Sequence, residues 1–481
     1  MSPGGDPQLR RNALGLGELV FQGVTHIGPA ANMMFAFPII ALAAGPVMPL
    51  SLLLATILCI FIANTVVEFS RYMPSSGGYY SFATRGLGAR GGFMATWSYL
   101  VYEFVGPAGV NGFFGYLISD ILRAEFALVI PWWTFALGTY ALIWWLTRHG
   151  IRLSMQITAL LGGIELLIML ALAITFLVHP APGSSYLAPL TPSLAPNHYG
   201  GIVGGMVLSI LSLSGFEAPA PLAQESRRAS TKVAQAVMLS LLATGVFYVF
   251  TSYASAIGWG TGNMAAFASN PNPYYDLGRS LWGGGWWLVI FALLNSSIAV
   301  GLASTNSASR VLYTMGRAGT MPERFGRIHP KFHTPTFAIA VQQVFGIVCM
   351  LIVGLLMNPD YIFNFLETIG ALAVIVLYVM ANLALTSYMR REHPNHFSIF
   401  KHVVVPWIGT LALLPVLVVT VWPIPAWPYN FVPYVFIVSL LLGFSYLWWI
   451  ESRHPGALQR GATMLVGSRT SDGGDVDWDR T

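Results

Sequence analysis

Ionisable side chains occur inside long apolar stretches of this sequence. A charged group in such a setting is costly, so each one is a candidate for moving protons or ions. His26 is the one histidine placed there, and its ordinary titration near neutral pH would suit a proton relay, with a hydrogen-bonded structural role as the alternative. The carboxylates in these stretches are Glu68, Glu103, Glu165, Glu217 and Glu367.

Glu165 lies near the middle of the apolar stretch 153–178, without an obvious basic partner. Because charge is costly away from water, a carboxyl group there could take a proton from one side of a membrane and release it to the other. A hydrogen-bonded glutamic acid with no such role and a sodium ligand are the alternatives. Glu217 has two interpretations, as a cap on a helix end or as a group that handles a proton or cation. For Glu367 a structural role is favoured over coupling.

Glycine and proline interrupt two of the apolar stretches, at Gly28–Pro29 in GVTHIGPAANMM and at 214–221 in SGFEAPAP. A simple kink is the alternative at either place, but interruptions at matching positions of two halves indicate a transporter binding site. An unwound helix exposes amide groups at the start of one half and carbonyl groups at the end of the other. The amides of Ala30 and Ala31 would suit a carboxylate, and the carbonyls of Leu211–Leu213 would suit an ammonium group.

The residues predicted to bind substrate therefore surround both interruptions. We expect a bulky side chain at Gly28 or Gly215 to abolish transport by filling the space that the substrate needs. Phe216 has two interpretations, an aromatic gate over the substrate or ordinary packing. The predicted substrate-binding residues are Thr25, Ile27, Gly28, Pro29, Ala30, Ala31, Leu211, Ser212, Leu213, Ser214, Gly215 and Phe216, and the predicted coupling or proton-carrying residues are Glu165, His26 and Glu217.

The composition of the 481-residue chain excludes a soluble protein. Hydrophobic residues make up 55% of it and charged residues only 9%, whereas soluble domains average about 25% charged residues. Cys59 and Cys349 lie in apolar stretches as small buried hydrophobes, and they give neither a disulfide framework nor a metal-ligand spacing. The polar N-terminus shows no cleavable signal, so the first hydrophobic segment is expected to target the chain. The sequence predicts an all-α membrane protein without a metal site or a cofactor.

Twelve apolar runs are long enough to span a membrane as helices. We expect two inverted five-helix repeats, 16–178 for helices 1–5 and 200–389 for helices 6–10, with helices 1 and 6 unwound at the midplane. Helices 11 and 12, within 403–450, lie outside the repeat, and the ends are an N-terminal tail at 1–15 and a disordered tail at 455–481. The runs lie near 16–44, 48–69, 93–122, 127–146, 153–178, 200–223, 233–257, 285–313, 335–357, 361–389, 403–422 and 432–450.

Basic residues fall on alternate loops of this predicted topology. All but two of the 24 Lys and Arg residues lie in the two tails and in every second loop, and the two exceptions are Arg123 and Arg279. This asymmetry predicts that both termini are cytoplasmic. The expected location of the protein is the plasma (inner) membrane. It also explains the formal net charge of +5 without a nucleic-acid partner.

Four passages resemble the amino acid–polyamine–organocation (APC) transporter superfamily, in its bacterial amino acid permease form. They are PSSGGYYSFATRGLGARGGFMATWSY (74–99), SGFEAPAPLAQESRRASTKVAQAV (214–237), SASRVLYTMGRAGTMPERFGRIHPKFHTP (307–335) and FLETIGAL (365–372). In that family the helix 1 segment commonly reads Ile-Gly-Ser/Thr-Gly, whereas this chain has IGPAA at 27–31. Some relatives place a lysine, which substitutes for a sodium ion, at what looks like the position of Glu165.

The resemblance implies a secondary active transporter that moves amino acids across the plasma membrane by alternating access, by proton-coupled symport or exchange. An importer or exchanger of cationic amines or polyamines and a sodium-coupled amino acid symporter are the alternatives. An enzyme is not expected, because the sequence lacks the HExxH, GxSxG, CxxC and phosphate-loop patterns. The expected partners are a small-molecule substrate, a coupling proton and the lipid bilayer. The oligomeric state stays open, a homodimer included.

Overall fold

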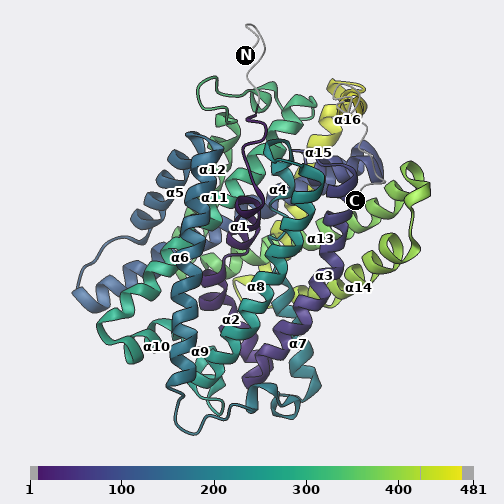
Figure 1. The fold of residues 1–481 in the computed structure, drawn as a ribbon. Coiled ribbons are helices and arrows are strands. Elements are labelled where there is room, and N and C mark those ends of the chain that lie inside the picture. The colour runs from purple at the N-terminus through teal and green to yellow at the C-terminus, as the bar shows by residue number, and fades with distance from the viewer. Residues whose placement is uncertain (1–8, 423, 468–481) are drawn as a thin grey trace.

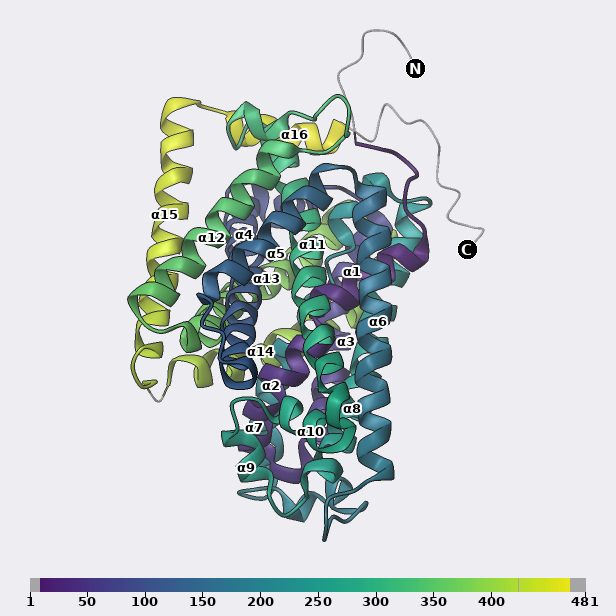
Figure 2. The same ribbon diagram turned by 90° about the vertical axis from the view of Figure 1, so that its left-hand side faces the viewer.

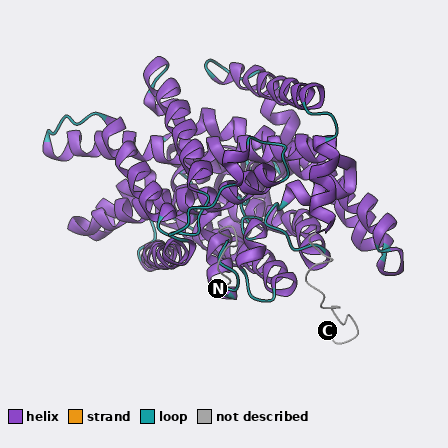
Figure 3. Ribbon diagram, turned by 90° about the horizontal axis from the view of Figure 1, so that it is seen from above, coloured by secondary structure: helices purple, strands orange, loops and turns teal. Residues whose placement is uncertain are grey.

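The computed structural model describes residues 9–422 and 424–467, and within these ranges every regular element is a helix. One isolated bridge, between Leu14 and Ser226, is the only strand-type pairing among them. The prediction of an all-helical protein is confirmed (Figure 3). The α-helices are α1 (Leu16–Ile27), α2 (Pro29–Ala44), α3 (Met48–Tyr72), α4 (Tyr79–Phe126), α5 (Trp132–Arg148), α6 (Ile151–Val178), α7 (Tyr199–Ser212), α8 (Ala229–Trp259), α9 (Met264–Ser269), α10 (Pro273–Trp282), α11 (Trp287–Arg317), α12 (Thr336–Leu356), α13 (Ile362–Glu392), α14 (Val405–Val421), α15 (Val432–Arg453) and α16 (Ala457–Gly467).

Eight helical stretches in the described part of the chain are long and apolar enough to cross a membrane, by length and composition. The protein is a multi-span membrane protein, as its sequence predicts. The eight stretches are Leu16–Tyr72, Ile151–Val178, Ala229–Trp259, Pro273–Arg317, Thr336–Leu356, Pro359–Glu392, Phe400–Val421 and Tyr429–Arg453.

Three expected spans are absent from these eight stretches. The helices α5 and α7 are shorter, with 17 and 14 residues, and the 48-residue α4 carries basic and glycine residues in its first turns and is non-helical at Gly88. The first two expected spans are joined in Leu16–Tyr72. The number of twelve crossings and the inverted repeats stay predictions.

Apolar side chains are exposed on the outermost helices, whereas polar side chains are buried at the centre. Leu441, Leu442 and Trp448 on α15 are all more than half exposed, and α15 forms one edge of the molecule in Figure 2. In contrast, Ser304 and Asn306 are fully buried on α11, which runs through the middle of the same view. This arrangement fits a lipid environment, in which helices associate through small and hydrogen-bonding side chains rather than through apolar burial.

The helices α1 and α2 meet at a single residue, Gly28. Its φ of +73° is a left-handed conformation that glycine adopts without strain. The next residue, Pro29, has no N–H and is favoured at the first position of a helix. The chain therefore ends one helix and begins the next without an intervening loop.

The second break is longer. The helix α7 ends at Ser212, residues 213–219 form turns, and Ala220–Glu225 form a 3₁₀ helix before α8 begins at Ala229. Gly215 has a φ of +114°. The break is therefore followed by a short 3₁₀ segment and not by an α-helix, because the positive φ at Gly215 and the prolines prevent a continuous α-helix.

The segment that precedes α1 pairs with the segment that precedes α8. The amides of Ala13 and Leu14 donate to the carbonyl of Glu225, at 2.8 and 3.0 Å, and the amide of Arg227 donates to Leu14 at 3.1 Å. Residues 1–8 of the predicted N-terminal tail lie outside the described residues. The short helices α9 and α10 lie at the end of the molecule opposite this pairing, as Figures 1 and 2 show.

Part of the predicted disordered tail is a helix. Residues 457–467 form α16, which packs against α4 and buries Ala457 and Leu458. This apolar contact explains why the polar composition of 455–481 is a poor guide for its first residues. Residues 468–481 lie outside the described part of the chain.

Candidate functional site

A cavity of about 60 Å³ lies where the two helix breaks meet. The predicted residues His26, Ile27, Ala31, Leu211 and Ser214 all line it. Its other lining residues come from α2, α4, α11 and α13, and sequence reasoning did not place them at the site. They are Asn32, Tyr102, Gly106, Pro107, Val110, Val300, Phe363 and Glu367.

The two breaks touch each other through Gly215. A Cβ atom at this position would lie 2.5 Å from Nδ1 of His26 and 3.0 Å from the backbone nitrogen of Ile27. A Cβ at Gly28 would lie 2.8 Å from a methyl group of Val300. Both glycines therefore permit close packing and a positive φ. A side chain at either position would first collide with the protein, which corrects the expectation that it would act by filling substrate space.

His26 has a carboxylate partner. Its Nε2 lies 2.9 Å from Oε2 of Glu103 on α4, and both side chains are buried. Nδ1 of His26 and Oε1 of Glu103 have no hydrogen-bond partner among the described residues. The pair can share a proton beside the cavity, since an imidazole and a carboxylate at this distance exchange donor and acceptor roles.

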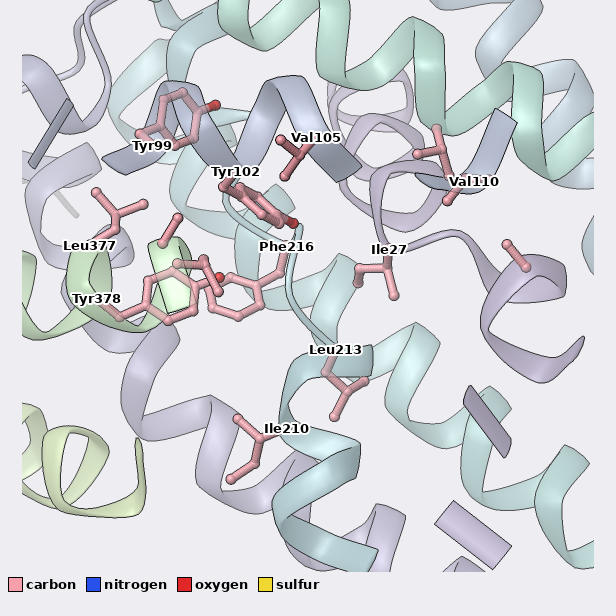
Figure 4. Packing of buried hydrophobic residues seen from close by; sticks show 14 of the residues in the cluster. Ile27, Tyr99, Tyr102, Val105, Val110, Ile210, Leu213, Phe216, Leu377 and Tyr378 are labelled. Atoms are coloured by element: carbon pink, nitrogen blue, oxygen red, sulfur yellow. The ribbon is translucent and has the colours of Figure 1, made fainter. Parts of the chain in front are cut away.

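Glu217 lies within the second break and accepts hydrogen bonds there. Its Oε2 accepts hydrogen bonds from the amide of Gly215 at 3.1 Å and from the hydroxyl of Tyr378 at 2.9 Å. Phe216 is fully buried and stacks on Tyr378, with ring centroids 5.8 Å apart (Figure 4). Neither Phe216 nor Glu217 lines the cavity, so in this conformation both residues support the unwound segment.

Glu165 has partners that its sequence context did not reveal. The amide of Ala30 donates to Oε1 of Glu165 at 2.6 Å, and the hydroxyl of Ser296 donates to the same oxygen at 2.8 Å. The amide of Ala31 donates in turn to the Ser296 hydroxyl at 3.2 Å. The amides that the sequence predicts to be free for a substrate carboxylate are therefore already bonded to side chains of α6 and α11.

The remaining predicted residues lie beside the cavity without lining it. The Thr25 hydroxyl bonds to the carbonyl of Phe21 in its own helix. Of the three carbonyl groups predicted to suit an ammonium group, that of Leu211 accepts the amide of Ser214 at 3.1 Å, whereas those of Ser212 and Leu213 accept no backbone hydrogen bond from the described residues. Figure 4 shows Leu213 and Ile27 on the segments that enter the two breaks.

Carboxylates dominate the charge around the breaks. Glu103, Glu165, Glu217 and Glu367 are accompanied by a single histidine, and none of the described residues lining the cavity is Lys or Arg. The nearby buried Arg310 is paired with Glu225 at 2.8 Å. Glu367 lines the cavity and makes no hydrogen bond or ion pair with a described residue. Acidic side chains therefore outnumber basic ones around the breaks in the described part of the chain.

An all-helical membrane protein with a cavity between two interrupted helices is typical of the class of small-molecule transporters. The comparison with known families makes this specific. The sequence model of the family described as "Amino acid permease" matches residues 20–452, so the chain belongs to the amino acid permease family. It is accordingly a transporter-family protein of the APC superfamily and not an enzyme.

Similar proteins differ in the substrates that their names give. The chain is 26% identical to the branched-chain amino acid permease BcaP of Bacillus subtilis, over 78% of this chain and 80% of BcaP. It is 25% identical to the low-affinity putrescine importer PlaP of Escherichia coli, over 84% of this chain and 87% of PlaP. It is 23% identical to a probable GABA permease of Pseudomonas aeruginosa, over 77% of this chain and 78% of that protein.

Proposed function

We propose that this chain is a secondary active transporter that moves amino acids or related amines across the plasma membrane by alternating access. The observation that carries the proposal is the cavity at the meeting point of the two helix breaks, which polar and apolar residues line together. Two inverted repeats, 16–178 and 200–389, would move against each other around it, with the helices in 403–450 outside the repeat. Both termini face the cytoplasm in this proposal, which the distribution of basic residues supports.

The substrate's amino group is proposed to bind at the second break. The open carbonyl groups of Ser212 and Leu213 end the helix α7, where the helix dipole is negative and attracts a cation. Ile27 and Ala31 would contact the rest of the substrate from the first break, since both line the cavity with Ser214. Thr25, Pro29 and Phe216 act indirectly by fixing the backbone on which these residues lie.

Transport is proposed to be coupled to a proton, with Glu165 as the carrier. The carboxylate caps the N-terminus of α2, where the helix dipole favours a negative charge. Protonation would remove that charge and weaken the cap, so loading and releasing a proton would change the stability of the first break. The pair of His26 with Glu103, together with Glu217, forms a second group of proton-binding residues at the same place.

A cationic amine is the second candidate substrate. The carboxylates around the breaks outnumber the one histidine there, and Glu367 lines the cavity without a partner among the described residues. The similarity to a protein named as a putrescine importer supports this candidate, and the similarity to one named as a branched-chain amino acid permease supports the first.

Counterflow in proteoliposomes tests the proposal. Purified protein should exchange internal unlabelled substrate for external radiolabelled substrate with at least one member of a panel of amino acids and amines. Protein-free vesicles are the control. An absence of counterflow with the whole panel, from protein that remains folded, would contradict the proposed function.

Imposed gradients then test the coupling. Uptake by wild type should rise with an inward proton gradient and not with a sodium gradient, and Glu165→Gln should lose this response. A wild type that needs sodium and ignores pH would contradict proton coupling. A Glu165→Gln variant that responds to pH as wild type does would exclude Glu165 as the carrier.

A further inference from the structure

The N-terminus of α2 is filled by a carboxylate of the protein itself. Oε1 of Glu165 accepts both the amide of Ala30 at 2.6 Å and the hydroxyl of Ser296 at 2.8 Å. The hydroxyl also accepts the amide of Ala31 at 3.2 Å, and the next amide, of Asn32, donates to the carbonyl of Gly28 at 2.9 Å. Every N–H of the first turn of α2 therefore has a partner.

This arrangement leaves no donor for the carboxylate of a zwitterionic substrate. Such a carboxylate would suit the first turn of α2, because amide groups and the helix dipole attract an anion there. Glu165 is fully buried and reaches this turn from α6, far away in the sequence. A second carboxylate beside the ionised Glu165 would place two like charges close together in surroundings with little water, which is unfavourable.

Several hydrogen-bond acceptors near the two breaks have no donor among the described residues. The carbonyl groups of Ser212 and Leu213 accept no hydrogen bond from the described residues, and the carboxylate of Glu367 lines the cavity. Oε2 of Glu165 is buried and has no hydrogen-bond partner in the described part of the chain. Ammonium groups have three donors and no acceptor, so they match these acceptors.

We propose that Glu165 substitutes for the carboxylate of the cargo, so that the preferred cargo is a small primary amine or diamine that lacks a carboxylate. Glu165 is then a specificity-determining residue, which excludes the parent amino acid by occupying the helix end that would bind its carboxylate. This inference rests on the proposed transport function and narrows its substrate class. Repulsion between the two carboxylates applies while Glu165 is ionised, and the occupied amides of Ala30 and Ala31 disfavour a substrate carboxylate at every stage in which these hydrogen bonds persist.

Matched pairs of ligands that differ only in the carboxylate test the inference. The pairs are 3-methylbutylamine with leucine, putrescine with ornithine, and cadaverine with lysine. Binding is measured from the shift in thermal unfolding of the detergent-purified full chain, and transport from inhibition of counterflow. For at least one pair, wild type should bind the amine at least ~10-fold more tightly than the amino acid.

Substitutions at Glu165 should reduce this preference. Glu165→Ala removes the carboxylate and frees the amide of Ala30, so the ratio of amine to amino acid affinity should fall by ~10-fold or invert. Met169→Ala is the matched control, because Met169 is a fully buried residue one turn along the same helix, and it should leave the ratio unchanged. If Glu165→Ala does not fold, Glu165→Gln keeps the shape, removes the charge and should still lower the ratio.

The outcomes separate this inference from the proposed function. Amine binding without any flux would support the inference and contradict transport. Counterflow in which the amino acid of every pair competes as well as its amine would support transport and overturn the inference. An unchanged ratio in both Glu165 variants would also overturn it, and the absence of binding and flux with all pairs would contradict both.

Discussion

The two helix breaks differ in how their backbone polar groups are satisfied. The first is a single residue, Gly28, and the amides that follow it are bonded to side chains from α6 and α11. The second runs over residues 213–219, and Glu217 supports it locally through the amide of Gly215. The end that would attract an anion is therefore closed by the protein, whereas the end that attracts a cation keeps open carbonyl groups. The comparison teaches that similar interruptions can have opposite consequences for the charge of the cargo.

The contact between the breaks should be the most sensitive to change. Gly215→Val would place a β-branched side chain at a φ of +114°, with its Cβ 2.5 Å from Nδ1 of His26. Backbone strain and overpacking together should lower the free energy of unfolding by about 4 kcal/mol and abolish transport. Denaturation in mixed detergent micelles measures the loss. Gly17→Ala, where a Cβ has no neighbour within 4 Å, should cause none, and equal behaviour of the two variants would refute the contact.

The second-largest effect is expected for the buried pair of His26 and Glu103. His26→Phe leaves the carboxylate of Glu103 buried without its partner, 2.9 Å away in wild type. The expected loss is about 3 kcal/mol of unfolding free energy, because an unpaired buried charge is strongly destabilising. The double variant His26→Phe/Glu103→Leu should recover part of it. Additive losses in this double-mutant cycle would show that the two residues do not interact.

Two adjacent serines on α11 allow a test of the hydrogen bonds at the N-terminus of α2. Ser296→Ala removes a donor to Glu165 and the acceptor for the amide of Ala31, so it should cost about 1–3 kcal/mol of unfolding free energy. Ser297→Ala is the control, since the buried hydroxyl of Ser297 has no partner among the described residues. Its effect should be close to zero. A larger effect at Ser297 than at Ser296 would contradict the hydrogen-bond network described for Glu165.

The local support of the second break should give the smallest effect. Tyr378→Phe keeps the ring that stacks on Phe216 but removes the hydroxyl that donates to Glu217 at 2.9 Å. The amide of Gly215 still bonds to that carboxylate, so the loss should be about 1 kcal/mol of unfolding free energy. Thermal unfolding of the purified variant measures it. A loss as large as that of His26→Phe would mean that the second break depends on Tyr378 far more than its contacts indicate.

Features that depend on local composition could be predicted from the sequence. The apolar runs gave the all-helical membrane fold, and glycine and proline marked where both breaks occur. The chain also placed His26, Ile27, Ala31, Leu211 and Ser214 at the site, because they lie within a few residues of those interruptions. In contrast, the composition of the C-terminal segment did not reveal α16, since a helix there depends on packing against α4.

The partners of the ionisable groups could not be predicted. Glu103 lies 77 residues from His26, and Glu165 lies 135 residues from Ala30. Such contacts are set by how whole helices pack, and a single sequence holds no signal for them. The sequence favours a structural role for Glu367, and only the structure shows that this residue of α13 lines the cavity. The sequence therefore could not predict that the amides of Ala30 and Ala31 are bonded to side chains of α6 and α11.

The central claim is that cargo passes through the cavity where the two breaks meet, and Gly106→Leu tests it most directly. Gly106 lines the cavity, and a Cβ there would meet only Oε1 of Glu367, at 3.7 Å, so we expect a leucine side chain to occupy cavity space. Counterflow is measured beside that of Gly138→Leu on α5, where a Cβ has no neighbour within 4 Å. We predict that Gly106→Leu retains the thermal stability of wild type and loses counterflow, whereas Gly138→Leu retains both. Unchanged counterflow in Gly106→Leu would contradict the claim.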